Sequence, residues 1–211
     1  MKPPTDGAAK GGPAALWNRR WKGAAEGRAV TLLGKWMFKA KAGALRNVLG
    51  TVSVRTAIEV GCGLGHTLAA VRSAGVEAVG VDISSEAVAH CLRKGLPASV
   101  RDLSEIEDRY DLVVSDGLLE HVLNFEPLAE RMMSVSRDYV LLIQPNHDSL
   151  MGKTLAFLAE ILGPRANVPE YHYRIRDFVG VFDRGGFRLV RSLPVFGDVF
   201  RLLLFRKEER P

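Results

Sequence analysis

The chain is poor in cysteine and has no long apolar run. Its two cysteines, Cys62 and Cys91, form neither a disulfide framework nor a metal-binding spacing, which indicates a reducing, cytoplasmic environment. A membrane-spanning helix needs ~18 consecutive apolar residues, whereas the longest apolar runs here, 140–143 and 202–205, have the length of strands. The opening residues, 1–7, contain no apolar segment of a secretory signal. We therefore expect no transmembrane segment.

Acidic residues are scarce in the first fifty positions. Residues 1–50 hold ten Lys and Arg against Asp6 and Glu26, a net charge of +8, while the remaining 161 residues hold 19 bases and 22 acids, a net charge of −3. A basic segment can serve contact with nucleic acid or an anionic membrane. A solvated helix face and a tail explain it more simply, because residues 1–13 are rich in Pro, Gly, Ala and Lys and are predicted to be a disordered basic tail.

Residues 14–207 have the pattern of one α/β domain. At 211 residues and 47% hydrophobic composition, the chain can bury one substantial core. Strand and helix patterns alternate after residue 55, which predicts a mostly parallel sheet with helices on both faces. Strands are expected at 55–60, 76–82, 98–101, 110–115 and 138–144, with a final antiparallel pair at 187–193 and 199–206. Helices are expected at 14–28, 30–49, 67–74, 84–94, 127–135, 149–162 and 175–183.

A glycine-rich loop follows the first of these strands, in the run Glu59-Val60-Gly61-Cys62-Gly63-Leu64-Gly65-His66. Glycine has no Cβ and tolerates positive φ, so such a loop lets the backbone approach a nucleotide-like ligand closely. The N-terminus of the next helix then faces the same ligand. The dinucleotide-binding pattern G-x-G-x-x-G requires a glycine at the position of His66. The spacing therefore disfavours a nicotinamide or flavin enzyme, and an ordinary strand-to-helix turn stays an alternative.

This loop resembles motif I of the class I S-adenosylmethionine (SAM) dependent methyltransferases, in which an acidic residue precedes G-x-G-x-G. Glu59 stands at the acidic position, and Gly61, Cys62, Gly63 and Gly65 form the loop. The resemblance implies that these residues bind SAM and that Glu59 lies near its cationic amino-acid end. It also implies a Rossmann-like seven-stranded sheet with the strand order 3-2-1-4-5-7-6, whose reversed strand matches the final antiparallel pair.

Two further acids stand at the ends of predicted strands. In an open α/β sheet, ligands bind beyond the carboxyl ends of the strands, where the strand order reverses. Asp82, followed by Ile83, ends the second strand 17 residues after Gly65, and a carboxylate there can accept both ribose hydroxyls. Asp102, followed by Leu103 as an apolar wall, comes just after the third strand and can accept from the adenine amino group. Each carboxylate can equally cap the turn that follows it.

The segment after the fourth strand narrows the resemblance. Residues 110–122 are similar to the corresponding segment of small-molecule methyltransferases of the ubiquinone-biosynthesis type, which implies that Ser115 and Asp116 line the methionine arm and that Leu118 or Leu119 touches the adenine. Some members bind a divalent metal through the pattern E-x-x-E-H. Because Gly117 replaces the first glutamate, one carboxylate and one imidazole remain, which is a poor site for a hard cation. We therefore expect no metal.

His121 is the candidate catalytic residue. Its imidazole titrates in a range suited to removing a proton from a hydroxyl, although a histidine just after a buried strand is more often a structural hydrogen-bonding group. Methyl transfer from a sulfonium is an in-line displacement, for which alignment contributes ~7–11 kcal/mol in well-oriented model reactions. An acceptor that is already nucleophilic therefore needs no base.

Elements outside the motifs are candidates for acceptor recognition. By the resemblance, Trp17 and Trp21, four residues apart on one helical face, are lid residues within the N-terminal helices 14–50; a helix packed on the sheet explains them equally well. Residues 146–176 are expected to form a substrate cap. Its leucine-rich helix and the run Tyr171-His172-Tyr173-Arg174 fit either an apolar pocket with a polar mouth or a packed loop.

These observations predict a SAM-dependent methyltransferase acting on a small or amphipathic acceptor, such as a quinone or a lipid-like phenol, with O-methylation favoured. One alternative is an RNA or protein methyltransferase that holds its substrate with the basic N-terminal segment. Another is a non-catalytic SAM-binding accessory protein. A nucleotide-sugar or NAD enzyme is disfavoured by His66 and by Asp102.

Overall fold

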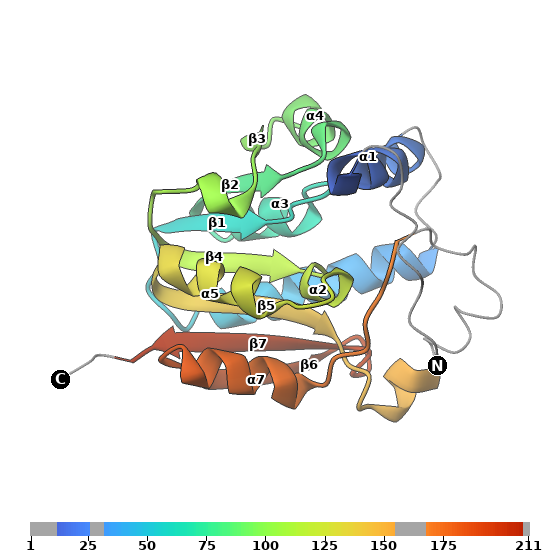
Figure 1. The fold of residues 1–211 in the computed structure, drawn as a ribbon. Coiled ribbons are helices and arrows are strands. Elements are labelled where there is room, and N and C mark those ends of the chain that lie inside the picture. The colour runs from blue at the N-terminus through green and yellow to red at the C-terminus, as the bar shows by residue number, and fades with distance from the viewer. Residues whose placement is uncertain (1–11, 26–31, 155–167, 209–211) are drawn as a thin grey trace.

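The computed structural model describes residues 12–25, 32–154 and 168–208 and contains one seven-stranded sheet in the order β3-β2-β1-β4-β5-β7-β6 (Figure 1). The predicted strand order is confirmed. The strands are β1 (Thr56–Val60), β2 (Glu77–Asp82), β3 (Ala98–Val100), β4 (Tyr110–Asp116), β5 (Ser136–Pro145), β6 (Phe187–Val195) and β7 (Phe200–Lys207).

Strand directions place a switch point between β1 and β4. The pairs β2/β3, β1/β2, β1/β4 and β4/β5 are parallel, and β7 runs antiparallel to both β5 and β6. Chain order reverses at β1 and β4, whose carboxyl ends lie side by side. Ligands of open α/β sheets bind beyond such an edge, so the fold places the glycine loop where a cofactor is expected.

The helices follow the predicted pattern with shifts of a few residues at their ends. They are α1 (Gly12–Ala25), α2 (Leu32–Leu49), α3 (His66–Ser73), α4 (Ser85–Arg93), α5 (Glu126–Val135) and α7 (Ile175–Arg184), with single turns η1 (Leu103–Glu105) and η2 (Leu119–His121). Helix α1 begins two residues before the predicted start, and residues 1–11 of the predicted tail lie outside the described ranges. Of the helix expected at 149–162, residues 150–154 are helical and 155–162 lie outside them.

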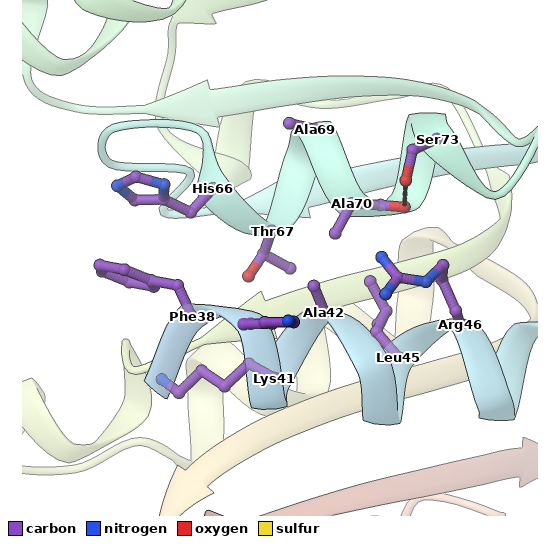
Figure 2. A pocket seen from close by; sticks show the side chains of 11 residues that line it. Phe38, Lys41, Ala42, Leu45, Arg46, His66, Thr67, Ala69, Ala70 and Ser73 are labelled. Carbon is purple, nitrogen blue, oxygen red and sulfur yellow. Dashed lines mark hydrogen bonds between the residues drawn. The ribbon is translucent and has the colours of Figure 1, made fainter. Parts of the chain in front are cut away.

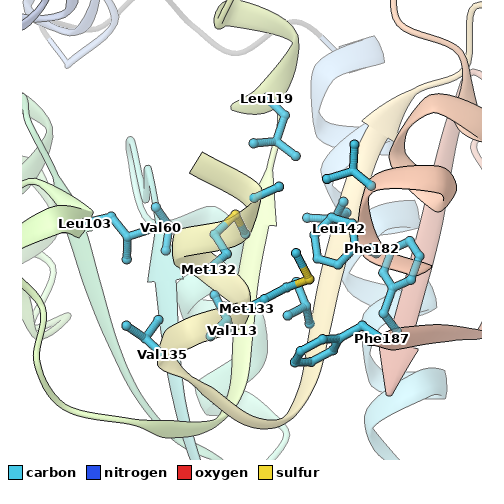
Figure 3. Close-up of a cluster of buried hydrophobic side chains, with 14 of the residues drawn as sticks. Val60, Leu103, Val113, Leu119, Met132, Met133, Val135, Leu142, Phe182 and Phe187 are labelled. Atoms are coloured by element: carbon cyan, nitrogen blue, oxygen red, sulfur yellow. The ribbon is translucent and has the colours of Figure 1, made fainter. Parts of the chain in front are cut away.

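Two apolar layers hold these helices on opposite faces of the sheet. Side chains alternate along β4: Val113 faces a cluster with α5 and α7 (Figure 3), whereas Leu112 and Val114 face a cluster with α2. Burying a large apolar side chain contributes about 1.5–3 kcal/mol, so both layers fix the sheet. Among the described residues, no helix is long and apolar enough to cross a membrane.

Candidate active site

The glycine loop joins β1 to α3 in a conformation that requires glycine. Gly61, Gly63 and Gly65 have φ values of +70°, +50° and +74°, a region in which a Cβ is strained. The loop is fixed by its own backbone, because the N–H groups of Gly61 and Cys62 both donate to the carbonyl of Val81 at 2.9 and 3.1 Å. The predicted strand-loop-helix unit is present.

The three glycines of the loop face different neighbours. A Cβ built on Gly61 would lie 3.1 Å from the side chain of Leu118, and one built on Gly63 would lie 3.0 Å from the ring of Trp21. On Gly65, a Cβ would lie 2.9 Å from the sulfur of Cys91. At Gly61 and Gly63 the absence of a Cβ therefore leaves room for other groups to approach the backbone at the carboxyl edge of the sheet. At Gly65 it allows the loop to pack on α4.

Asp82 ties the glycine loop to the end of β2. Its Oδ2 accepts from the N–H of Gly63 at 2.9 Å, and its Oδ1 accepts from the N–H of Ser84 at 2.8 Å. Burial raises the pKa of Asp82, and the hydrogen bonds from Ser84, Gly63 and the following Ile83 oppose that rise. Each carboxylate oxygen has a second lone pair, so these bonds orient the group and leave it able to accept from a ligand.

Asp102 makes the turn-capping contact that was the alternative at this position. Its Oδ1 accepts from the N–H and the hydroxyl of Ser104 at 2.8 and 2.6 Å, and these two bonds lower its pKa. Asp102 follows β3 directly and is exposed. Its second oxygen, Oδ2, belongs to this exposed carboxylate. Leu103 is buried at 4% exposure and packs in the core cluster with Val60 and Val81.

Glu59 is a buried acid with incomplete hydrogen bonding. It is 3% exposed and accepts from the backbone N–H of Leu68 in α3. Its Oε2 has no hydrogen-bond partner among the described residues. Burial is the main cause that raises the pKa of Glu59 well above its usual value, and the nearby charge of Asp116 adds to the rise. A cation beside Oε2 would offset this cost.

Asp116, at the end of β4, accepts hydrogen bonds from two side chains, one on α2 and one on α3. Lys41 of α2 donates to Oδ1 at 2.6 Å, and the hydroxyl of Thr67 donates to Oδ2 at 2.9 Å. Lys41 is only 8% exposed, and its ammonium lies 4.0 Å from the centroid of the Phe200 ring. On the other face, the hydroxyl of Ser115 donates to the carbonyl of Val60 at 3.2 Å. Ser115 thus braces β1 against β4.

His121 lies in η2 directly after β4. Its Nδ1 lies 2.7 Å from the carbonyl oxygen of Pro169, which can only accept, so Nδ1 carries the proton and Nε2 has the free lone pair. Burial lowers the pKa of His121, which favours the neutral ring. The ring of Trp17 meets the imidazole edge-on, with 5.1 Å between centroids.

Helix α1 covers the glycine loop and the start of α4. Asn18 accepts at Oδ1 from the hydroxyl of Ser84 at 2.7 Å, and Ser84 itself caps α4 by accepting from the N–H of Ala87. Trp17 and Trp21 stack with 6.0 Å between centroids, and Trp21 lies against Gly63. Within the described ranges, the indole N–H of Trp21 is buried and has no partner. The two tryptophans therefore cover the site.

The segment that leads into α7 packs over η2. The N–H of Tyr171 donates to the carbonyl of Glu120, and the hydroxyl of Tyr173 donates to the carbonyl of Val122 at 2.9 Å. The ring of Tyr173 lies edge-on to Phe125, with 4.7 Å between centroids. The run Tyr171-His172-Tyr173-Arg174 had two interpretations, an apolar pocket with a polar mouth and a packed loop. The contacts of Tyr173 fit the packed loop.

A cavity of about 340 Å³ lies between α2 and α3, beside the Lys41–Asp116 pair. Figure 2 shows Phe38 and His66 at one end and Arg46 and Ser73 at the other. Phe38 and His66 stack with 4.0 Å between centroids. This cavity opens on the helix side of the glycine loop. In the part of the chain that the structure describes, no group of three or more His, Cys, Asp or Glu could hold a metal ion.

Comparison with known proteins assigns the family. A model of the methyltransferase domain family matches residues 33–192, and this chain belongs to that family. The prediction of a class I SAM-dependent methyltransferase, and thus of a transferase, is confirmed. The finer prediction, that the chain is of the ubiquinone-biosynthesis type, stays a prediction. No curated protein sequence matches the chain.

Solved structures share the fold at low identity. Magnesium protoporphyrin IX methyltransferase (ChlM) from Synechocystis PCC 6803, with bound SAH, is 17% identical, with a TM-score of 0.74 over 92% of this chain and 98% of that one. Mitomycin 7-O-methyltransferase MmcR is 20% identical, with a TM-score of 0.65 over 83% of this chain and 55% of that one. The third structure is a complex between the Haloferax volcanii Trm112 methyltransferase activator and a putative methyltransferase. It is 13% identical, with a TM-score of 0.69 over 93% of this chain and 96% of that one.

The structure gathers most of the predicted residues at one edge and adds two that the sequence did not indicate. Glu59, Asp82 and Asp116 converge around the glycine loop, as their places at strand ends predict. Lys41 was missed, because a lysine in an amphipathic helix is usually solvated. Gln144, buried near the end of β5, also lies at this edge and was not among the predicted site residues.

Proposed function

We propose that the chain transfers a methyl group from SAM to a small, hydroxylated acceptor. The observation that carries the proposal is the convergence of three acids, Glu59, Asp82 and Asp116, on a glycine loop at the switch point of the sheet. SAM combines a ribose, which needs a hydrogen-bond acceptor, with a sulfonium and an ammonium, which favour nearby negative charge. The acids supply both.

The residues present fit this cofactor. Asp82 is fixed beside Gly63 and can accept from ribose hydroxyls, while Glu59 offers the unpartnered Oε2 to a cation. Gly61 and Gly63 have no side chain that a ligand would meet. The side chains that now lie on the two glycines, Leu118 on Gly61 and Trp21 on Gly63, can move, unlike the backbone. In this proposal, Asp102 and Leu103 bind the adenine of SAM.

A lid formed by α1 follows from the same contacts. Trp21 lies on Gly63, and Asn18 is hydrogen-bonded to Ser84 at the start of α4. For SAM to reach the loop, these contacts open and re-form over it. The buried indole N–H of Trp21, which has no partner in the described part of the chain, then gains a hydrogen-bond acceptor from the ligand. Helix α1 thereby excludes water from the reacting atoms.

His121 serves as the base for a hydroxyl acceptor. Bound SAM supplies an electrophilic methyl group on a positively charged sulfur. His121 Nε2 would take the proton of the acceptor hydroxyl and so leave its oxygen free to accept that methyl group, with the sulfur keeping the electrons of its bond to carbon. The hydrogen bond from Nδ1 to Pro169 fixes the tautomer that this step requires. The structural neighbour mitomycin 7-O-methyltransferase, whose name describes O-methylation, supports the choice of oxygen.

An RNA substrate is the second candidate, because the first 50 residues carry a net charge of +8. Phosphate contacts make affinity fall steeply with salt. Binding of a labelled RNA that is weakened by deleting residues 1–28 and by added salt would favour this candidate. RNA binding that the deletion leaves unchanged would remove it.

Calorimetric titration with SAM tests the cofactor site. Asp82→Ala is expected to weaken SAM binding by at least about 1–3 kcal/mol, the scale for lost hydrogen bonds to a charged group. Gly63→Val is expected to abolish binding, because its side chain fills the approach to the loop. The matched control is Asp108→Ala, at an exposed aspartate before β4 at the opposite edge of the sheet. Unchanged affinity in both site variants would refute the assignment.

Methyl transfer itself is tested with methyl-labelled SAM and a deproteinised cell extract. Label in a small organic product supports the proposal, and label in added RNA supports the alternative. Tight SAM binding without transfer to either pool would indicate an accessory protein that does not catalyse.

A further inference from the structure

Two polar side chains near the cofactor edge are buried without the partners that buried polar groups need. Gln144 is 0% exposed, and neither its Oε1 nor its Nε2 has a hydrogen-bond partner within the described ranges. Glu120 is 5% exposed, and its Oε2 likewise has none there. More than nine in ten buried polar groups in proteins are hydrogen-bonded. The described part of the chain therefore leaves the polar atoms of both side chains open to a ligand.

The strand pattern places both side chains on the same side of the sheet. Val140 and Leu142 of β5 point into the cluster on the α5 and α7 face, so Gln144, two residues further on, points to that face as well. Leu119 of η2 belongs to the same cluster (Figure 3), and η2 packs on β5. Gln144 thus lies beneath the turn that carries Glu120.

Backbone contacts fix Glu120 over the carboxyl ends of β4 and β5. The N–H of Gly117 donates to the carbonyl of Ile143 at 3.0 Å. A Cβ on Gly117 would lie 3.2 Å from Oε1 of Glu120. The carbonyl of Glu120 accepts from Tyr171, which brings the segment before α7 over the same place. This is the edge at which Asp116 ends β4, beside the proposed cofactor.

The charges around these side chains disfavour an anion. Burial is the main cause that raises the pKa of Glu120 to about 8, and the nearby charges of Glu170 and Asp116 add to the rise, so the carboxyl is protonated at neutral pH. Lys41 is the cation that acts on Glu120, and its ammonium is already paired with Asp116 at 2.6 Å. An amide and a neutral carboxyl remain, which together offer donors and acceptors but no positive charge.

We propose that Gln144 and Glu120 form the subsite that recognises the acceptor, and that they take an uncharged group carrying both a hydrogen-bond donor and an acceptor oxygen. A ring hydroxyl beside a carbonyl or a second hydroxyl has this chemistry. The inference rests on the proposed function, because the subsite lies beside the cofactor loop. It excludes a phosphate or carboxylate at the methylated end of the acceptor.

Thermal unfolding of Gln144→Met tests the subsite without knowledge of the acceptor. Methionine keeps the length of the side chain and removes the unpaired amide. The free protein is then expected to unfold at a temperature higher by at least about 2 °C, the shift that a modest stabilisation produces in a domain of this size. The matched control is Leu142→Met, on the same face of the same strand, which is expected to leave that temperature unchanged or slightly lower.

A second arm measures transfer. With methyl-labelled SAM and a deproteinised cell extract, the label is expected in products that pass through an anion exchanger at neutral pH. Gln144→Met is expected to reduce this label at least tenfold while calorimetric affinity for SAM stays within twofold. Such a result separates the acceptor subsite from the cofactor site, since failure of the proposed function appears as lost SAM binding in the unmodified protein.

Two outcomes overturn the proposal. A lower unfolding temperature for Gln144→Met than for Leu142→Met would mean that the amide is satisfied in the folded protein and is structural. Label found only in products that the anion exchanger retains would mean that the acceptor is anionic, contrary to the uncharged group proposed here. The unfolding result decides the question even where no label is transferred.

Discussion

Lys41→Met is the substitution for which the structure gives the clearest magnitude. The Lys41 ammonium and Asp116 Oδ1 are 2.6 Å apart, with side chains 10% and 11% exposed. At an effective dielectric constant of ~20, such a contact has a gross Coulomb energy of about 6 kcal/mol, much of which desolvation offsets. Methionine loses the ammonium contact with the Phe200 ring and leaves Asp116 with the Thr67 hydroxyl alone. Removing one partner of a buried pair costs about 3–5 kcal/mol.

Urea unfolding of a double-mutant cycle measures this interaction directly. We expect Lys41→Met to lower the free energy of unfolding by about 3–5 kcal/mol at constant m-value. Adding Asp116→Asn removes the uncompensated charge, so the coupling energy between the two changes is expected to be at least about 2 kcal/mol.

The exposed pair Arg184–Glu126 is the matched control, because its atoms lie 3.1 Å apart while the side chains are 65% and 52% exposed. Its coupling energy is expected to stay below about 1 kcal/mol. Equal coupling in the two pairs, or a cost below about 1 kcal/mol for Lys41→Met, would refute the argument that burial makes the Lys41–Asp116 pair strong.

Three further predictions concern the loop, the buried acid and the lid. Gly65→Ala is expected to destabilise the protein by more than about 2 kcal/mol in urea unfolding, since its φ is +74° and its Cβ meets Cys91; Gly75→Ala, with φ +87° and open space, should cost less. The raised pKa of Glu120 means that only the folded state keeps this proton between pH 4.5 and about 8, so stability through this group falls as pH rises, by up to ~1.4 kcal/mol per unit. Glu120→Gln should remove that slope, and an identical slope in both proteins would contradict it. Trp21→Ala is expected to speed SAM dissociation in stopped-flow measurements, and an unchanged rate would argue against the lid.

The local patterns of the sequence predicted the sheet and the loop correctly. Strand and helix periods alternate because each parallel strand needs a crossover helix, and this alternation was enough for the strand order once the family resemblance was added. Gly61 and Gly63 were identified because glycine alone adopts their backbone conformation without strain. The position of Asp82 at the end of β2 was predicted because the end of a strand is a local property; its role in binding SAM stays a prediction.

The tertiary structure decided which distant side chains meet. Lys41 and Asp116 are 75 residues apart, and no period in the sequence relates a position on α2 to the end of β4. Trp21 reaches Gly63 only because α1 packs on α4. Gln144 has the polarity of a solvated residue and is buried only because β7 and η2 cover the end of its strand. A sequence determines how each segment folds from its own side chains, whereas burial and pairing depend on which surfaces the whole chain brings together.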